Sequence, residues 1–370
     1  MIHGPARLVL HVVPALFGDD DGITGGAERY ALELARHMAK EVPTRLVTFG
    51  ARERTERIGA LDIRVIGNAW HVRGQRLNPF APALLGEVLR ADIVHCHQNH
   101  TVAGSTSALL ARLTGRKAFA TDLGGGGWDI SSYVSTDRLF NGHLHISNYS
   151  RHISGHDTSA SAHVIWGGVD GHRFSPAAAE RDHVLFVGRL LPHKGVDVLL
   201  RALPDDMPAT IFGPAYDQRY LRDLRAISGG KAVTFIHGGS DDELVRAYQE
   251  ATCIVLPSVY DDMYGGHTTV PELLGQTLLE GMACGAPAIG TDVASLPEII
   301  QHRVTGLIVP PNDTDALRHA LLELAAAPGS ARQMGEAARQ DVNERFSWPA
   351  VVARCLEHYG VSRDRKREAA

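Results

Sequence analysis

A repeated order of sequence segments, present in both halves of the chain, limits the possible folds more than any other feature. A short apolar run, a loop with a glycine and an amphipathic stretch follow one another repeatedly. This alternation is typical of parallel sheets covered by helices on both faces. The expected strands lie near 7–13, 44–49, 62–66, 92–96, 117–121, 143–146, 183–187, 209–212, 232–236, 253–256, 286–289 and 307–309. The expected helices lie near 26–40, 80–90, 101–113, 194–203, 217–227, 241–250, 276–284, 295–301 and 313–326.

The pattern predicts an α/β protein of two doubly wound, Rossmann-like domains that face each other across a cleft. The 370 residues are enough for two such domains. We place the first domain at 1–165, the second at 166–345, and a C-terminal helix that crosses back, with a frayed tail, at 346–370. Ligands of doubly wound sheets lie beyond the carboxyl ends of the strands, so the two domains are expected to share one site.

Composition excludes several classes of partner. The formal net charge of -5 argues against a nucleic-acid partner. No apolar run reaches the ~18 residues that a membrane-spanning helix needs. No polybasic helix is evident either, so membrane association is not expected. Four scattered cysteines, without CxxC pairs, and the absence of a signal-peptide pattern predict a cytoplasmic protein.

The segment PELLGQTLLEGMACGAPAIGTD carries the most informative chemistry. Glu272 and Glu280 are eight residues apart, and Gly275 precedes the expected helix start. Free N–H groups at a helix start form an anion site. The amides concerned are those of Gln276, Thr277 and Leu278. Carboxylates accept hydrogen bonds from hydroxyls, so a phosphate site beside two of them predicts a sugar nucleotide as ligand. The alternative is a pair of acids that stabilises the helix dipole.

The segment VGRLLPHKG places Arg189 and Lys194 after an expected strand. Arginine can bind phosphate oxygens with two hydrogen bonds and lysine supplies a point charge, so the pair is suited to a departing diphosphate. An exposed loop pair without function is the alternative interpretation.

These segments, together with HVIWGGVDGHRFSP, LPSVY, VTGLIVPPND and ERFSWPAVVARCLEHY, give the chain a clear resemblance. It resembles the family 4 retaining glycosyltransferases, which have the GT-B fold. The resemblance implies that Glu272 lies by the donor sugar, that Glu280 binds the ribose, and that Arg189 and Lys194 hold the diphosphate. It also implies a nucleoside diphosphate sugar as co-substrate, with no cofactor and no metal.

Two glycine loops are further candidates for donor binding. Gly25 and Gly26 lie at the turn into the first helix, where glycine lets the backbone approach a ligand. The segment VTFIHGGSDDELVRAY resembles the family loop that reads the nucleobase, which makes Gly238 and Gly239 candidates. An ordinary tight turn is the alternative for the first loop.

The acceptor site is expected in the first domain. VHCHQNH suggests either a metal site or, as we prefer, histidines that line the cleft, with His97 touching the acceptor. In FATDLGGGGWDIS, Asp122 stands at the position where many relatives have histidine, and a mobile glycine loop leads to Trp128 and Asp129. A flexible connector with an anchoring tryptophan is the alternative for this loop. The segment 261–271 is an insertion relative to the family and is interpreted as a lid or an acceptor wall.

These features predict a metal-independent, retaining hexosyltransferase that moves a glucose or N-acetylglucosamine type sugar, most simply from a UDP-sugar, to an acceptor hydroxyl. The acidic walls suggest an aminocyclitol or amino sugar of a natural product, such as an antibiotic, as acceptor. Their members are Asp19, Asp20, Asp21, Asp122, Asp129, Asp261 and Asp262. Three alternatives stay open: a transferase of cell-surface polysaccharide or glycolipid synthesis, a nucleotide-sugar epimerase of the same fold, and a non-catalytic sugar-nucleotide sensor.

Overall fold

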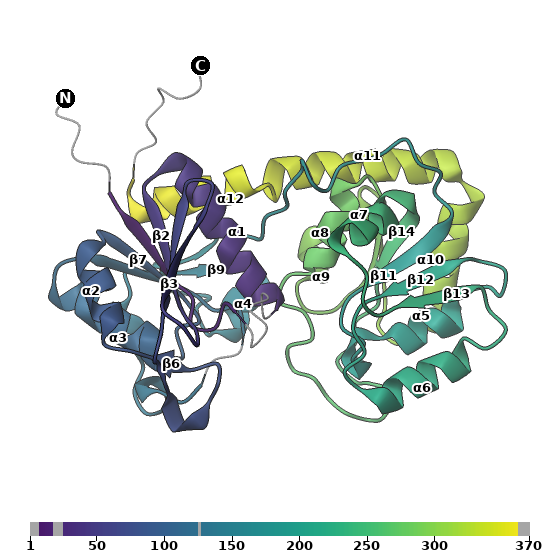
Figure 1. Ribbon diagram of the computed structural model, residues 1–370. Helices are drawn as coiled ribbons and strands as arrows, with labels where there is room; N and C mark the ends of the chain where they lie inside the picture. The colour runs from purple at the N-terminus through teal and green to yellow at the C-terminus, as the bar shows by residue number, and fades with distance from the viewer. Residues whose placement is uncertain (1–6, 18–24, 125–126, 362–370) are drawn as a thin grey trace, which may run out of the picture. The chain divides into compact units, whose positions relative to one another are not determined.

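The computed structural model describes residues 7–17, 25–124 and 127–361. The chain forms two compact units (Figure 1). Unit 1 consists of Met1–Gly168 and Trp348–Ala370, and unit 2 is Val169–Ser347. The bounds predicted from the sequence lie within three residues of these limits.

Unit 1 is built on an eight-stranded sheet in the order β10-β9-β8-β7-β1-β2-β4-β3. The strands are β1 (Val9–Val12), β2 (Thr44–Phe49), β3 (Arg54–Ile58), β4 (Leu61–Ile66), β7 (Ile93–His97), β8 (Lys117–Thr121), β9 (Gly142–His145) and β10 (Ala162–Val164). Every residue of β1, β7 and β9 is buried, as expected for central strands with helices on both faces. All neighbouring strands pair in parallel except β3, which is antiparallel to β4.

The helices of unit 1 are α1 (Gly26–Glu41), α2 (Ala83–Arg90), α3 (Val102–Leu113), α4 (Asn148–Ile153) and α12 (Trp348–Tyr359). Helix α1 buries Tyr30, Leu34 and Met38, which recur every four residues on one face. Helix α12 packs on α1 through Trp348, whose ring lies 5.3 Å from that of Tyr30. The C-terminal helix therefore belongs to unit 1 although the chain reaches it through unit 2 (Figure 1).

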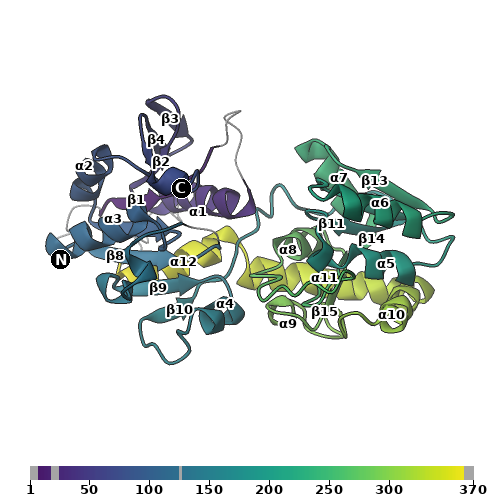
Figure 2. The same ribbon diagram turned by 90° about the horizontal axis from the view of Figure 1, so that it is seen from below.

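Unit 2 has a six-stranded, wholly parallel sheet in the order β13-β12-β11-β14-β15-β16. Its strands are β11 (His183–Val187), β12 (Ala209–Phe212), β13 (Val233–Ile236), β14 (Ala251–Leu256), β15 (Ala288–Thr291) and β16 (Gly306–Val309). Its helices are α5 (Val196–Ala202), α6 (Gln218–Ile227), α7 (Asp241–Glu250), α8 (Gln276–Ala283), α9 (Leu296–Ile299), α10 (Thr314–Ala326) and α11 (Pro328–Arg345). Figure 2 shows these helices on both faces of the unit 2 sheet.

Local sequence explains several helix starts in unit 2. Asp217 caps α6 by accepting from the amides of Arg219 and Tyr220. Ser240 and Glu243 form a reciprocal capping box at the start of α7. Such caps satisfy amides that have no partner within the helix.

The predicted strands and helices are present, but the structure contains further elements that the alternating sequence pattern did not predict. They are the antiparallel β3, the hairpin of β5 (Trp70–His71) and β6 (Pro79–Phe80), and α4, β10 and α11. Helix α2 begins at Ala83 rather than near 80, because residues 79–80 pair in that hairpin.

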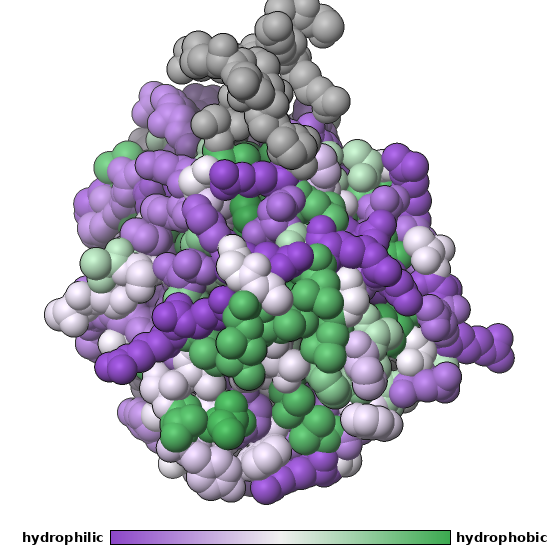
Figure 3. Space-filling view, turned by 90° about the vertical axis from the view of Figure 1, so that its left-hand side faces the viewer, coloured by the Kyte–Doolittle hydropathy of each residue, from purple (hydrophilic) through white to green (hydrophobic). Residues whose placement is uncertain are grey.

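The surface of unit 1 carries a group of apolar side chains. Figure 3 shows them among polar residues on the side of unit 1 where α2 and α3 lie. Leu89, Leu109 and Leu113 of these two helices are 44%, 45% and 74% exposed. Among the described residues, no helix is both long and apolar enough to cross a membrane. The four cysteines are free and buried.

Candidate functional site

The order of strands in unit 2 creates a place for a ligand. The chain proceeds outward from β11 to β12 and β13, and then returns to the other side of β11 with β14. The loops after β11 and β14 therefore leave the sheet in opposite directions, and the gap between them is the usual ligand site of a doubly wound sheet. Both loops carry residues that the sequence predicted as catalytic.

Lys194 and Glu272 meet at this switch point. Lys194 ends a short 3₁₀ turn, Pro192–Lys194, and its ammonium forms an ion pair with Glu272 Oε1. It also donates to the carbonyl of Pro271 at 3.2 Å. The hydroxyl of Ser258, just after β14, donates to Glu272 Oε1 at 2.9 Å. The two charged side chains are only 11% and 10% exposed, so the pair is largely shielded from water.

Arg189 lies beside this pair and has a different environment. Its side chain is exposed, and the guanidinium makes no hydrogen bond or ion pair with the residues that the structure describes. Its charge nevertheless acts on its neighbour His193: burial and the charge of Lys194 lower the pKa of that imidazole, Glu272 opposes the shift, and Arg189 lowers the pKa further. Both cations thus act on the same imidazole, and the Arg189 guanidinium is available to an anionic ligand.

The start of α8 has the geometry of an anion site. Gly275 is its N-cap with φ 87° and ψ 46°, a left-handed conformation that favours glycine. A Cβ there would lie 2.9 Å from Leu296 Cδ2. The backbone amide of Thr277 donates no hydrogen bond to a described residue outside α8, so it is free for a ligand. Leu278 differs from the prediction, because its amide donates to the carbonyl of Gly275 at 3.0 Å.

Glu280 lies on the same helix, one turn beyond Gln276. Its Oε2 accepts a hydrogen bond from the hydroxyl of the buried Tyr248 at 2.8 Å, and its Oε1 lies 3.5 Å from the side-chain amide of Gln276. Burial and the charge of Glu280 raise the pKa of Tyr248 well above its ordinary value, so the phenol remains a donor. These contacts hold the carboxylate of Glu280 in one orientation.

The two glycines after β13 are not equivalent. A Cβ on Gly239 would lie 2.3 Å from the ring of Phe212, so glycine is required there by packing. A Cβ on Gly238 would meet nothing within 4 Å, and the residue is exposed at the carboxyl edge of the sheet. Of the two predicted donor residues, Gly238 is the one with open space beside its Cα among the described residues.

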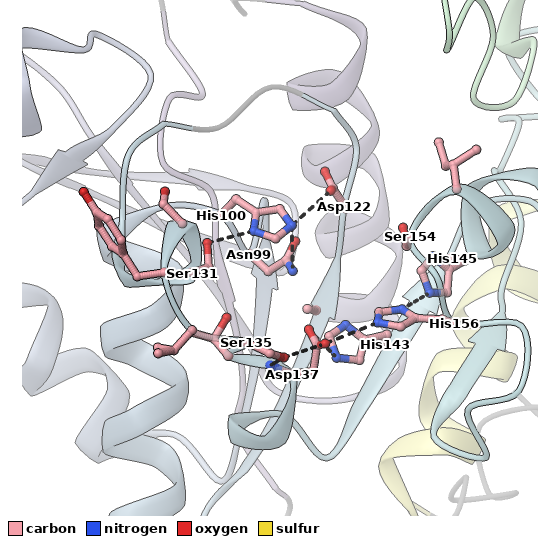
Figure 4. A pocket seen from close by; sticks show the side chains of 16 residues that line it. Asn99, His100, Asp122, Ser131, Ser135, Asp137, His143, His145, Ser154 and His156 are labelled. Carbon is pink, nitrogen blue, oxygen red and sulfur yellow. Dashed lines mark hydrogen bonds and ion pairs between the residues drawn. The ribbon is translucent and has the colours of Figure 1, made fainter.

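Unit 1 contains a cavity of about 540 Å³ at the carboxyl ends of β8 and β9. Figure 4 shows His100 and Asp122 on one wall and a group of three imidazoles on the other. Its lining residues are Asn99, His100, Ala120, Asp122, Ser131, Ser132, Tyr133, Val134, Ser135, Thr136, Asp137, His143, His145, Ile153, Ser154 and His156. Most of these can donate or accept hydrogen bonds, so the cavity suits a ligand rich in hydroxyls.

The sequence matches two family profiles. Residues 24–122 match the profile described as Glycosyltransferase Family 4, and residues 170–341 match Glycosyl transferases group 1. The chain belongs to glycosyltransferase family 4. Its two Rossmann-like units are those of the GT-B fold.

Three curated relatives illustrate the range of this family. An uncharacterized glycosyltransferase of Methanocaldococcus jannaschii is 31% identical over 48% of this chain and 45% of the relative. A GDP-mannose-dependent alpha-(1-6)-phosphatidylinositol monomannoside mannosyltransferase of Mycobacterium tuberculosis is 30% identical over 63% of this chain and 62% of the relative. A D-inositol 3-phosphate glycosyltransferase of Salinispora tropica is 25% identical over 96% of this chain and 84% of the relative. The chain thus spans about half to three fifths of the length of the first two relatives.

Solved structures show the same fold at low sequence identity. Anabaena HepE in complex with UDP has a TM-score of 0.73 at 17% identity, covering 96% of this chain and 99% of that chain. Sucrose-phosphate synthase from Thermosynechococcus elongatus has a TM-score of 0.70 at 19% identity, covering 96% and 98%.

Helix α1 begins at Gly26, at the glycine turn where the sequence predicted a helix start. Gly25 is the N-cap, and a Cβ on Gly26 would meet nothing within 4 Å among the described residues. Glu28 in the first turn is buried, and burial raises the pKa of its carboxyl. The acidic residues Asp19, Asp20 and Asp21 lie outside the described residues.

Two predicted acceptor residues are placed differently from the expectation. His97 is 1% exposed and shares a hydrogen bond of 2.9 Å with His11, so a ligand in the cavity does not reach it. Asp129 is also 1% exposed and caps the 3₁₀ turn Ile130–Ser132, accepting from Ser131 N at 2.8 Å and from the hydroxyl of Ser105. Both side chains serve the folded structure, and the exposed member of the VHCHQNH motif that lines the cavity is His100.

The other two predicted acceptor residues remain accessible. Asp122 lines the cavity, where its Oδ1 accepts from Gly124 N at 2.9 Å and its Oδ2 lies 3.8 Å from His100. Trp128 is half-buried, with the Arg73 guanidinium 3.9 Å from its ring centre. Its backbone is fixed by the side chains of Gln75 and Asn78, as an anchoring tryptophan would be.

The insertion 261–271 is an ordered loop fixed to unit 2. Asp262 accepts from the amides of Tyr264 and Gly266, and Asp261 pairs with His267 at 2.7 Å. The hydroxyl of Tyr264 donates to Asp223 on α6. These two aspartates therefore stabilise the loop itself and do not form a free acidic wall.

The imidazoles on the second wall of the cavity were not predicted from the sequence. His143 and His145 alternate on β9, so both project from the same face of the sheet, and His156 follows α4. Burial lowers the pKa of His143 to about 4 and that of His145 to about 3, so both rings are neutral at pH 7. The two histidines of β9 are visible in the sequence as GHLH, but Asp137 and His156, which lie next to them, come from other segments of the chain.

Proposed function

We propose that this family 4 chain is a retaining glycosyltransferase that moves a hexosyl group from a nucleoside diphosphate sugar to an acceptor hydroxyl. The observation that carries the proposal is the group at the switch point of unit 2. There the ion pair of Lys194 and Glu272, the free guanidinium of Arg189 and the glycine-capped start of α8 lie around the ends of β11 and β14. The cations and the free amide can bind the oxygens of a diphosphate. The carboxylates can accept hydrogen bonds from the hydroxyls of the attached sugar and ribose.

The reaction follows from these groups without a covalent enzyme intermediate. The bond between the anomeric carbon and the diphosphate breaks, and Arg189 and Lys194 stabilise the charge that gathers on the leaving phosphate. The acceptor hydroxyl attacks from the same face, and its proton passes to a leaving phosphate oxygen, so the configuration is retained. Glu272 orients the sugar and Glu280 the ribose. In this proposal no metal is required at the diphosphate.

The acceptor we propose is a polyol such as a cyclitol or a sugar. The lining of the unit 1 cavity supports this, with His100, Asp122, Ser131 and Ser135 among its hydrogen-bonding groups. An amino group on the acceptor now has little support, because Asp129, Asp261 and Asp262 are engaged within the protein. The relative from Salinispora tropica, named for D-inositol 3-phosphate, agrees with a cyclitol.

A thermal-shift screen of the full chain tests the donor. UDP-glucose, UDP-N-acetylglucosamine, GDP-mannose, ADP-glucose and a dTDP-sugar are compared, because a bound ligand stabilises the folded state by mass action. We expect one base to raise Tm clearly, with a UDP-sugar first and GDP-mannose second. We also expect Glu280→Ala to weaken binding of that donor at least about 10-fold, by loss of charge-assisted hydrogen bonds.

Glu323→Ala is the control, because Glu323 is an exposed carboxylate of unit 2 that pairs with Arg303. Equal donor affinity of Glu280→Ala and the wild-type protein would refute the role of Glu280. Once the donor is known, NMR of the product gives the anomeric configuration. An inverted product would overturn the retaining mechanism, and consumption of the donor without any acceptor would favour the epimerase.

A glycolipid acceptor is the second candidate function. It is favoured by the exposed Leu89, Leu109 and Leu113 on α2 and α3 and by the relative named for phosphatidylinositol monomannoside. If it is correct, the wild-type chain sediments with vesicles that contain phosphatidylglycerol, and Leu109→Ser with Leu113→Ser abolishes this. Leu322→Ser, an exposed leucine of unit 2, is the control. A chain that stays in the supernatant with all vesicles excludes this candidate.

A further inference from the structure

A second set of chemically active side chains lies in the unit 1 cavity, apart from the residues that the proposed function uses. Asp137 comes from the 3₁₀ turn Asp137–Leu139, His143 from β9 and His156 from the segment after α4. Figure 4 shows the two rings next to the carboxylate at one end of the cavity. Three separate segments of the chain therefore converge on one point.

The distances among these groups are somewhat longer than those of an occupied metal site. His143 Nε2 lies 3.8 Å from one oxygen of Asp137, and His156 Nε2 lies 3.8 Å from the other. One ligand atom from each of the three residues can be chosen so that the three atoms lie within 4.8 Å of one another. In a tetrahedral zinc site with bonds of about 2.0 Å, neighbouring ligand atoms are about 3.3 Å apart. The two nitrogen–oxygen distances of 3.8 Å exceed this spacing by about 0.5 Å, so a bound ion would draw the three side chains closer together.

One ligand atom is buried without a hydrogen-bond partner. His143 is 5% exposed, and its Nε2 accepts or donates no hydrogen bond among the described residues. A buried polar atom left in this state is unfavourable unless another ligand satisfies it. This nitrogen faces Asp137, where a cation would lie.

The neighbouring residues hold the ligands in place. His145 Nε2 and His156 Nδ1 are hydrogen-bonded at 3.0 Å, which leaves the Nε2 of His156 for the cation. The hydroxyl of Ser135 donates to Asp137 Oδ2 at 2.8 Å. Outer partners of this kind fix the orientation and tautomer of metal ligands.

We propose that Asp137, His143 and His156 bind a divalent first-row transition metal ion, for which Zn²⁺ has suitable ligands and geometry. Three protein ligands leave at least one coordination position, and the cavity lies beside it. Water, or an oxygen of a hydroxylated or phosphorylated ligand in the cavity, occupies that position. The site is independent of the donor chemistry in unit 2.

A second histidine group is a weaker candidate. His11, His95 and His97 also lie within ligand distance of one another, but all three are fully buried. Both nitrogens of His95 are already hydrogen-bonded, to Thr121 at 2.7 Å and to Tyr359 at 2.7 Å. This group has no carboxylate and does not line the cavity, so it serves as the competing site in the test.

The test is a metal titration of the full chain after removal of metals with a chelator. Zn²⁺ binding is followed by calorimetry and Co²⁺ binding by its visible absorption, with metal content measured by mass spectrometry after gel filtration. We expect one ion per chain, and a loss of Zn²⁺ affinity of at least about 100-fold in Asp137→Asn and in His156→Gln. Asp137 is 49% exposed, so its variant keeps the fold, which circular dichroism checks. His145→Gln should weaken binding about 10- to 100-fold.

His152→Gln is the matched control, because His152 is an exposed histidine that pairs with Asp157 at 2.6 Å outside the proposed site. Its affinity should equal that of the wild-type chain. A folded chain that binds no Zn²⁺ overturns the proposal. So does a site that persists in Asp137→Asn and His156→Gln but is lost in His97→Gln, since that pattern places the ion at the other histidine group.

Discussion

Replacing Arg189 with alanine is expected to lower kcat by about 10²- to 10³-fold while changing the donor Kd by less than 10-fold. The guanidinium is exposed and has no partner among the described residues, so the folded protein does not depend on it. Its positive charge stabilises the transition state more than the bound substrate, because negative charge develops on the leaving phosphate in the transition state. The loss therefore falls on the chemical step. Initial rates with the donor identified by the screen, and donor binding by calorimetry, measure the two quantities.

The stability of the variant separates catalysis from folding. An exposed substitution of this kind changes the free energy of unfolding by no more than about 0.5 kcal/mol, so Tm stays close to the wild-type value. Arg225→Ala is the control, because Arg225 is exposed in the last turn of α6. Full activity of Arg189→Ala, or a loss equal to that of Arg225→Ala, would contradict the assignment.

The donor side of the molecule was predictable because its signals are local. Most of these residues lie in the loop after a strand or in the first turns of a helix, and parallel strands bring their carboxyl ends to one edge of the sheet. The expected strand order thus places Lys194 and Glu272 at one edge of the sheet although they are 78 positions apart in sequence, and the structure pairs them. Their roles in the reaction remain predictions.

The acceptor side could not be predicted to the same extent, because burial is decided by the packing of distant segments. Asp129 looked like part of an acidic wall, but the helix that supplies Ser105 covers it. His97 ends a strand, yet its ring packs against His11 of the neighbouring strand. No pattern within either motif distinguishes an exposed side chain from a buried one.

Elements without a clear apolar period were missed for a related reason. Helix α11 buries only Gly335, Ala338, Asp341 and Val342 of its 18 residues. A Cβ on Gly335 would lie 2.2 Å from the carbonyl of Gly285, so the helix packs backbone against backbone. Close packing of small residues gives no hydrophobic stripe in the sequence.

The ion pair of Lys194 and Glu272 leads to the second large effect. Both side chains are about nine-tenths buried, and removing one partner leaves the other charged and poorly solvated. Lys194→Ala is therefore expected to lower the free energy of unfolding by about 3 kcal/mol and to reduce kcat at least about 10³-fold. Urea unfolding and initial rates measure the two effects.

The loss of activity in Lys194→Ala has two sources, and a double variant separates them. Lys194→Met combined with Glu272→Gln removes both charges while keeping similar volumes, and the glutamine carbonyl can still accept from Ser258. Replacing a buried ion pair by uncharged residues of similar volume is often neutral for stability. The double variant should therefore regain most of the about 3 kcal/mol of unfolding free energy that Lys194→Ala loses. Activity should not return, because the diphosphate lacks its cation and the sugar its carboxylate. A double variant that regained both stability and turnover would show that the pair is structural, and the catalytic roles of Lys194 and Glu272 would have to be abandoned.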